Sequence, residues 1–137
     1  MPLAYRVDHE KRLVVTAGYG TLTDDDVFGH EREISARADT IGYDELFDVS
    51  HITGIALPSP ERVHDLAAEA AARDESRGSS RIAIVAPGDV AYGLGRMFQT
   101  RRELDRRSKT TVGVFRTMAE ALTFLELDTA PTLPTPD

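Results

Sequence analysis

The chain contains 137 residues, carries a formal net charge of -7 and has no cysteine. Its length is typical of a single domain with a core of its own. The acidic charge argues against a general nucleic-acid-binding protein and against a protein held on an anionic membrane surface, because both depend on dominant basic patches. The absence of cysteine excludes disulfides, thiolate catalysis and cysteine-ligated metals.

Apolar residues are dispersed along the chain. No apolar run of signal-peptide type follows Met1. No window approaches the ~20 consecutive apolar residues that a membrane-spanning helix needs. We therefore expect a soluble cytoplasmic protein without a membrane span.

The first third of the chain predicts a hairpin followed by a helix. Residues 4–8 and 12–19 are strand-like, and the three polar residues between them give hairpin spacing. Thr23 precedes three aspartates, whose charges favour the positive end of a helix dipole. We expect a helix over residues 23–38.

The middle of the chain predicts a strand and a second helix. Residues 43–50 contain the next strand. Ser59 and Pro60 then offer a helix cap and a first-turn proline. The alanines on the apolar face of this helix indicate close approach to a neighbouring element. Residues 74–80 are expected to form a loop.

The last part of the chain begins with a short apolar run at residues 82–86, which predicts a central parallel strand covered on both faces. A helix over residues 92–107, a strand over 111–115 and a helix over 118–127 follow. Thr117 and Glu120 have the spacing of a capping box at the start of the last helix.

The predicted order is β-β-α-β-α-β-α-β-α, which favours a single α/β domain over residues 1–127. We expect a mixed, mostly parallel five-stranded sheet with an antiparallel N-terminal hairpin strand at its edge. The strand order stays open, as does the choice between helices on one face and on both. Residues 128–137 form a Pro/Thr-rich tail, either mobile or pinned against its own domain or a partner.

The segment from Gly88 to Gly95 has two interpretations. Glycines between a strand and a helix can present backbone N–H groups to a phosphate. A P-loop, however, needs lysine and then serine or threonine where Leu94 and Gly95 stand, and a dinucleotide fingerprint needs glycine where Phe98 stands. We prefer a strand-to-helix turn with glycines at points of close packing.

Cationic residues gather after this turn, and they form either a docking face for an acidic partner or a solvated helix face. They are Arg96, Arg101, Arg102, Arg106, Arg107 and Lys109.

His30, with Asp26 and Glu33 nearby, lacks the ligand count of a metal site. We expect an exposed histidine that pairs with Asp26, and we predict no metal and no cofactor.

Polar residues follow two strands at the edge where open α/β sheets bind ligands. Ser50 and His51 are adjacent in a strand and point to opposite faces, which argues against a catalytic triad. We predict no catalytic residue. The candidate ligand- or partner-binding residues are Asp48, Ser50, His51, Asp89, Tyr92 and Arg96.

Three segments carry a resemblance to a known family: IAIVAP from Ile82, YGLGRMF from Tyr92 and VFRTMAEAL from Val114. With Asp48, Val49 and Ser50, they resemble the STAS superfamily of anti-sigma-factor-antagonist-like (SpoIIAA-like) domains, and within it an uncharacterised bacterial branch. The resemblance covers residues 3–127. It implies a small α/β fold with a mixed sheet and a non-catalytic regulatory or interaction module. It also implies likeness in fold to CRAL-TRIO lipid carriers.

One segment departs from the phosphorylation-controlled members of this superfamily. They have an Asp-Ser-Ser-Gly-like sequence where this chain has Ala56, Leu57, Pro58 and Ser59. Ser59 precedes Pro60 and suits a helix cap, so the phosphorylation switch is not carried over.

Three functions are open at this stage. The first is a regulatory or interaction module that binds a protein partner or a second copy of itself, without nucleic acid. The second is a carrier or sensor of a small apolar ligand, for which Tyr92, Met97 and Phe98 are candidates near the strand ends. A hydrolase using Ser50 or His51 is the least favoured.

Overall fold

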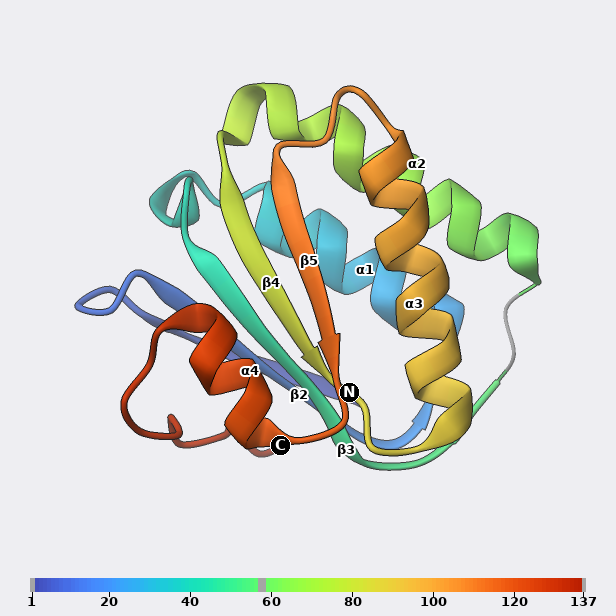
Figure 1. The fold of residues 1–137 in the computed structure, drawn as a ribbon, viewed down its shortest axis with the longest axis vertical. Coiled ribbons are helices and arrows are strands. Elements are labelled where there is room, and N and C mark those ends of the chain that lie inside the picture. Colours follow the sequence, from blue (N-terminus) through green and yellow to red (C-terminus); the bar gives the residue numbers. More distant parts are fainter. Residues whose placement is uncertain (1, 57–58, 137) are drawn as a thin grey trace.

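The chain folds into a sheet with helices on both faces, as Figure 1 shows. The computed structural model describes residues 2–56 and 59–136, apart from the side chain of Glu75. These residues form five strands, four α-helices and one short 3-10 helix, η1. Their bounds are β1 (Leu3–Asp8), β2 (Leu13–Leu22), α1 (Asp24–Ser35), η1 (Ala38–Thr40), β3 (Asp44–Ile55), α2 (Pro60–Arg77), β4 (Ser80–Val85), α3 (Asp89–Leu104), β5 (Thr110–Phe115) and α4 (Met118–Leu125).

The strands lie side by side in chain order, β1-β2-β3-β4-β5. β1 and β2 are antiparallel, and every other neighbouring pair is parallel. The predicted α/β class, the five-stranded mixed sheet and the antiparallel hairpin strand at its edge are therefore confirmed. Each parallel strand is reached through a helix, as the βαβ pattern requires.

The helices are divided unequally between the two faces of the sheet. α1, α2 and α3 lie on one face, and α4 lies on the other (Figure 1). α2 packs against both α1 and α3. Because α2 bridges two helices, it forms a further layer on that face, and this arrangement creates the site described below.

Three helices begin at the capping residues that the sequence predicts. Thr23 forms a capping box with Asp26 before α1. The Ser59 hydroxyl accepts a hydrogen bond from the Arg62 backbone N–H at 3.3 Å before α2. Thr117 accepts one from the Glu120 backbone N–H before α4. These bonds satisfy donors that the first helical turn leaves free. Leu57 and Pro58, in the segment compared with the phosphorylated one, lie outside the described residues.

Two hydrophobic clusters cover the two faces of the sheet. On the α4 face, Ala121 and Leu125 pack against a group from the strands: Leu13, Val15, Leu46, Ala83 and Val85. On the opposite face the cluster includes Leu3, Leu22, Val49 and Ala86, with Val27 and Ile84 against it. Because successive side chains of a strand point to opposite faces, β2 and β3 each contribute residues to both clusters.

The C-terminal tail lies against its own domain. Leu133 packs on the cluster of the α4 face. Arg6 Nε donates to the Thr132 carbonyl at 2.7 Å, and the Tyr19 hydroxyl donates to the Pro134 carbonyl at 2.7 Å. Residues of β1 and β2 thus hold this part of the chain.

Several predicted boundaries are wrong, and tertiary contacts explain the largest difference. α2 continues through residues 74–77, which the sequence assigns to a loop. Asp74 accepts a hydrogen bond from the Thr110 backbone N–H, and Arg77 donates to the carbonyls of Ser35 and Arg37. These bonds stabilise the last turn of α2.

The other boundary errors are smaller. α1 ends at Ser35, three residues before the predicted end, and η1 begins at Ala38. β2 and β3 continue beyond their predicted ends to Leu22 and Ile55. α3 begins at Asp89 and ends at Leu104, three residues earlier than predicted at each end.

Candidate functional site

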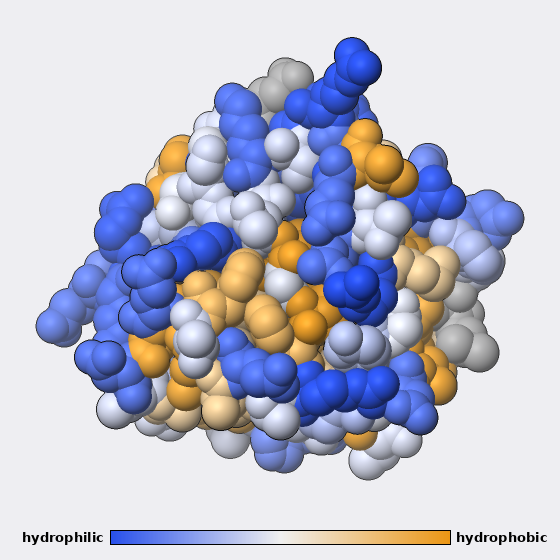
Figure 2. Space-filling model, in the orientation of Figure 1, coloured by the Kyte–Doolittle hydropathy of each residue, from blue (hydrophilic) through white to orange (hydrophobic). Residues whose placement is uncertain are grey.

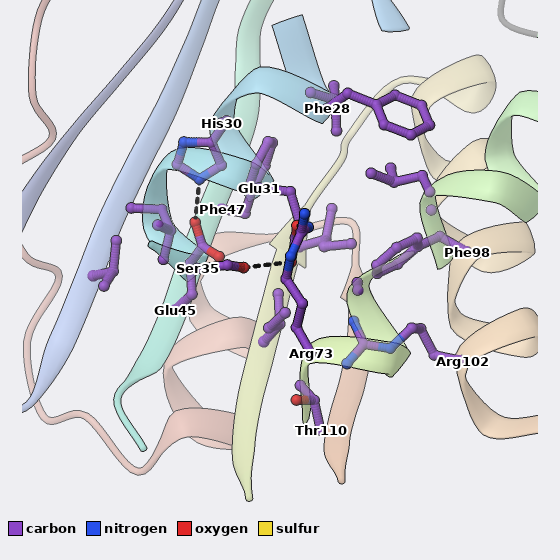
Figure 3. Close-up of a pocket in the computed structure, with 18 of the residues that line it drawn as sticks. Phe28, His30, Glu31, Ser35, Glu45, Phe47, Arg73, Phe98, Arg102 and Thr110 are labelled. Carbon is purple, nitrogen blue, oxygen red and sulfur yellow. Dashed lines mark hydrogen bonds and ion pairs between the residues drawn. The ribbon is translucent and has the colours of Figure 1, made fainter. Parts of the chain in front are cut away.

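A cavity of about 240 Å³ lies between the sheet and the three helices on one face. Strands β2, β3 and β4 line its sheet side, and α1, α2 and α3 line the rest. Figure 3 shows the side chains that converge on it. Most of the lining is apolar and includes Phe28, Phe47, Leu66, Ile82, Leu94 and Phe98.

The cavity follows from the sequence of α2. The helix bridges α1 and α3, and it presents Val63, Leu66 and Ala70 to the space beneath it. Ala70 is only 4% exposed, and its methyl group leaves open the volume that a larger side chain would occupy. The alanine-rich face therefore allows close helix contacts and a hollow below.

A polar cluster lies in the cavity wall. The Nε2 atom of His30 lies 2.7 Å from Glu45 Oε2 and 3.3 Å from Thr16 Oγ1. The Thr16 hydroxyl donates to the same carboxylate oxygen at 2.6 Å. The rings of Tyr5 and Phe47 lie edge-on to the His30 ring, with centroids 5.7 and 5.5 Å away. Because an ionised carboxylate can only accept, His30 and Thr16 both donate to Glu45.

The environment of Glu45 favours its ionised form. Burial raises the pKa of Glu45, but the charge and hydrogen bond of His30 and the hydrogen bond of Thr16 outweigh this effect. The pKa of Glu45 is therefore lowered from its ordinary value. A buried carboxylate of this kind is stable only while its partners stay in place.

The predicted role of His30 is wrong. The residue is 9% exposed and lies against the sheet, whereas the sequence analysis expects an exposed histidine. Its expected partner, Asp26, accepts from the backbone N–H and hydroxyl of Thr23. The position of His30 on the inward side of α1 brings it to Glu45 on β3 instead.

The other carboxylates of the cavity lining are paired with arginines. Arg62 Nε donates to Asp24 at 2.8 Å. Arg73 forms an ion pair with Glu31, which is drawn in Figure 3. Each of these pairs joins α2 to α1.

The fourth pair is the most deeply buried. Arg102 on α3 is 2% exposed and donates to Asp74 on α2 at 2.8 Å. Asp74 also accepts from the backbone N–H groups of Lys109 and Thr110, at 2.6 and 3.0 Å. This carboxylate therefore ties α2, α3 and β5 together at one end of the cavity.

Arg77 is the remaining charged residue of the lining, and its described partners are neutral. It donates to the carbonyls of Ser35 and Arg37 at 3.0 and 2.8 Å, and to the Thr40 hydroxyl at 2.7 Å. These groups follow the C-terminus of α1, where the helix dipole favours a cation. The charges around the cavity are thus compensated within the protein.

Comparison with known proteins identifies the fold. No family model and no curated protein matches the chain. Five chains of known structure match it. One is an uncharacterised protein of the DUF3478 family with a SpoIIAA-like fold from Shewanella loihica PV-4, at 16% identity and a TM-score of 0.54, covering 90% of this chain and 93% of that one. This chain has a SpoIIAA-like fold.

The resemblance predicted from the sequence is thereby confirmed at the level of fold. The match covers most of both chains. At this identity the likeness concerns architecture alone, and function has to be argued from the site.

In this SpoIIAA-like structure, one group of predicted binding residues lies on β3, on the face opposite the cavity. Asp48 is 1% exposed, and its Oδ1 atom accepts from the backbone N–H of Ser50 at 2.9 Å and from the Ser50 hydroxyl. Nδ1 of His51 lies 3.9 Å from Asp48 Oδ2, and the His51 ring contacts the Tyr19 ring. The three predicted residues are therefore neighbours in space. The expectation that Ser50 and His51 point to opposite faces is wrong, because the register between β2 and β3 shifts between Asp48 and His51.

A second group lies at the start of α3. Arg116 donates to Asp89 at 2.6 Å, and its guanidinium lies 4.1 Å from the ring centroid of Tyr92. Arg96 is exposed and makes no hydrogen bond or ion pair within residues 2–56 and 59–136. Arg116 is a member of this group that the sequence analysis did not identify.

The glycine segment of this SpoIIAA-like chain is a packing feature. Gly88 precedes the first residue of α3. Gly95 is buried, and a methyl group at its position would lie 3.0 Å from Val114 Cγ1. The preferred interpretation, with glycine at a point of close approach between helix and sheet, agrees with this geometry.

The predicted cationic patch is broken up by internal pairing. Arg102 is buried against Asp74, and Arg107 pairs with Asp105 at 2.8 Å. Arg101 and Arg106 are exposed. Arg102 is the buried member of the predicted patch, because the helical period of α3 puts it on the inner side of the helix.

Two kinds of feature are absent from the described residues. They contain no group of three or more His, Asp or Glu side chains placed to hold a metal ion. No helix in the same part of the chain combines the length and apolar character needed to cross a membrane.

Most of the cavity lining was not predicted from the sequence. Of the carrier candidates, Phe98 lines the cavity, whereas Met97 is exposed and Tyr92 lies at the Arg116 group. One usable signal was Glu45, a carboxylate that shares a strand face with Phe47 and Val49. A charged residue on an inward strand face requires a buried partner.

Proposed function

We propose that this chain is a non-catalytic binding module whose cavity takes a small, uncharged, apolar molecule. The observation that carries the proposal is the cavity of about 240 Å³ with a mostly apolar lining between the sheet and α1, α2 and α3. Concave apolar spaces with a few placed polar groups are the usual form of small-molecule sites.

The volume supports a ligand of modest size. An apolar protein cavity of about 150 Å³ accommodates benzene. By proportion, a cavity of about 240 Å³ has room for a molecule of roughly ten non-hydrogen atoms. At about 0.8 kcal/mol per buried CH₂ group, ten such groups give about 8 kcal/mol, which corresponds to a dissociation constant of about 1 μM before association costs. These costs weaken the binding toward the millimolar range.

The charge pairing supports an uncharged ligand. Asp24, Glu31 and Asp74 are each paired with an arginine, and Glu45 lies within hydrogen-bond distance of His30 and Thr16. Arg77 is engaged with the carbonyls that follow α1. A charged ligand would have to lose hydration without a free counter-charge to replace it. Hydrocarbon-like and weakly polar molecules avoid this cost.

The same pairing supports a binding role over a catalytic one. A nucleophile or general base needs a group that is free to exchange a proton with the substrate. The carboxylates of the lining are held in hydrogen bonds to His30 or to arginines, and Arg77 is held in hydrogen bonds to carbonyls and a hydroxyl. By analogy, the SpoIIAA-like fold supports a regulatory or interaction role, in which ligand binding would be sensed by a partner.

Isothermal titration calorimetry with n-butylbenzene tests the proposal. Ala70→Leu fills the cavity from α2, and Ala72→Leu is the matched control because Ala72 is exposed on the same helix. We expect saturable binding by the native chain and by Ala72→Leu, with a dissociation constant between about 1 μM and 1 mM, and at least about tenfold weaker binding by Ala70→Leu. Octanoate should bind more weakly than 1-octanol to the native chain. Equal affinities of the two alanine variants, or no binding by the native chain, would refute the proposal.

A further inference from the structure

A line of exposed hydrophobic residues runs along the outer side of α3. Val90, Met97 and Leu104 are 58%, 37% and 71% exposed. Of the four exposed large hydrophobic side chains among the described residues, these three lie on α3. They are seven residues apart, so they lie on one side of the helix.

The positions between them are small. Gly93 and Thr100 are both exposed and fall at the intervening positions of the same heptad pattern. We call Val90, Gly93, Met97, Thr100 and Leu104 the α3 stripe. α3 lies along one outer side of the molecule in Figure 1, and Figure 2 shows hydrophobic surface emerging between hydrophilic side chains there. Single exposed hydrophobic residues are ordinary, but an aligned row marks an interaction surface.

Two opposite charges flank the stripe on one edge. Arg96 and Glu103 are seven residues apart and both exposed. Neither makes an ion pair within the described part of the chain. In an antiparallel pair of identical helices, each edge meets the same edge of the partner in the reverse direction. Arg96 of one copy would therefore meet Glu103 of the other, twice in the interface.

We propose that two copies of this chain associate through the α3 stripe in an antiparallel, two-fold arrangement. The register that joins Arg96 to Glu103 also places Leu104 of each copy against Gly93 of the other, and Met97 against Thr100. Large side chains thus meet small ones, as interdigitated helix packing requires. This inference is independent of the cavity and of its ligand.

The size of the α3 stripe limits the expected affinity between the two copies. α3 has 16 residues and is about 24 Å long. A single helix pair of this length buries less area than the roughly 1,200 to 2,000 Å² of a standard stable interface. The net charge of -7 on each copy adds repulsion. We expect a reversible dimer whose population rises with concentration.

Sedimentation velocity of the full chain across a concentration series, at ~0.15 M ionic strength, tests the inference. The native chain should show a monomer-dimer equilibrium. Arg96→Glu and Glu103→Arg should each raise the dissociation constant by about tenfold or more, because each places like charges together at two points. The double variant should restore dimerisation. Leu104→Lys should abolish it.

Glu33→Arg is the matched control, because Glu33 is exposed on α1 and the charge change equals that of Glu103→Arg. It should dimerise at least as well as the native chain. A native chain that stays monomeric throughout the series overturns the inference. So does a dimer with the same dissociation constant in the native chain, both single variants and the double variant. A monomeric chain that cosediments with phosphatidylcholine and phosphatidylglycerol vesicles would assign the stripe to a lipid surface and would also overturn it.

Discussion

Glu45 on β3 and His30 on α1 form a nearly buried pair, with 2.7 Å between Oε2 and Nε2, in the wall of an otherwise mostly apolar cavity. The pair fixes α1 against the sheet at the place where the cavity begins. Thr16 on β2 completes the cluster. Three elements therefore depend on one carboxylate, which makes it a sensitive point for stability and for the shape of the cavity.

Glu45→Gln should lower the free energy of unfolding by about 2 kcal/mol at neutral pH, since a hydrogen bond to a charged group is worth about that much. The folded-state pKa of Glu45 lies below the ordinary value of 4.5. Its contribution is therefore complete above pH 4.5 and declines as the pH falls through the folded-state pKa. Urea unfolding at neutral pH and below pH 4.5 measures the difference.

The control for this change is Glu10→Gln, since Glu10 is exposed in the β1 to β2 turn. It should alter the free energy of unfolding by less than about 0.5 kcal/mol. A difference between Glu45→Gln and the native chain that does not shrink on acidification would show that the ionised carboxylate is not the source of the stability.

Asp74→Asn should destabilise the protein by about 3 to 5 kcal/mol, because it leaves the buried guanidinium of Arg102 without its counter-charge. Asp65→Asn removes the same charge from an exposed site on the same helix and should cost less than about 0.5 kcal/mol. Thermal unfolding of both variants gives the comparison. Similar melting temperatures for the two would disprove a structural role for the buried pair.

Gly93→Ala and Gly95→Ala separate helix propensity from packing in the glycine segment. Nothing lies within 4 Å of a methyl group at Gly93, so the substitution should stabilise α3 by about 1 kcal/mol. At Gly95 the methyl group approaches Val114 at 3.0 Å, and the gain should be lost. We expect the free energy of unfolding of Gly93→Ala to exceed that of Gly95→Ala by at least about 1 kcal/mol. Urea unfolding, at concentrations where the chain is monomeric, measures this difference. Equal stabilities would contradict close packing at Gly95.

Local signals in the sequence were enough to predict the α/β class and the mixed five-stranded sheet, but not the strand order or the division of the helices between the two faces. The caps at Thr23, Ser59 and Thr117 fixed three helix starts, and the apolar run at 82–86 identified a buried parallel strand. The errors fell where contacts between distant residues decide the outcome. The sequence of the last turn of α2 is polar and predicts a loop. In the structure, Asp74 and Arg77 hold this turn in helical form through hydrogen bonds to β5 and to the end of α1.

The candidate site was harder to predict for the same reason. Six polar residues at strand ends were proposed from topology, and the structure separates them into a group around Asp48 and a group around Arg116, with Arg96 exposed alone. The cavity arises from the height at which α2 crosses α1 and α3. Sequence periodicity tells which side of α2 faces inward, but not how far that side lies from the sheet.

The most direct test of the central claim is a methyl-resolved NMR titration of the full chain with n-butylbenzene. Leu66, Ile82 and Leu94 line the cavity, whereas Leu125 and Leu133 lie in the cluster on the other face of the sheet. We predict saturable shifts of the first three methyl signals, and unchanged signals from Leu125 and Leu133. Saturable shifts confined to the α4 face, or no saturable shift at all, would contradict a ligand cavity between the sheet and α2.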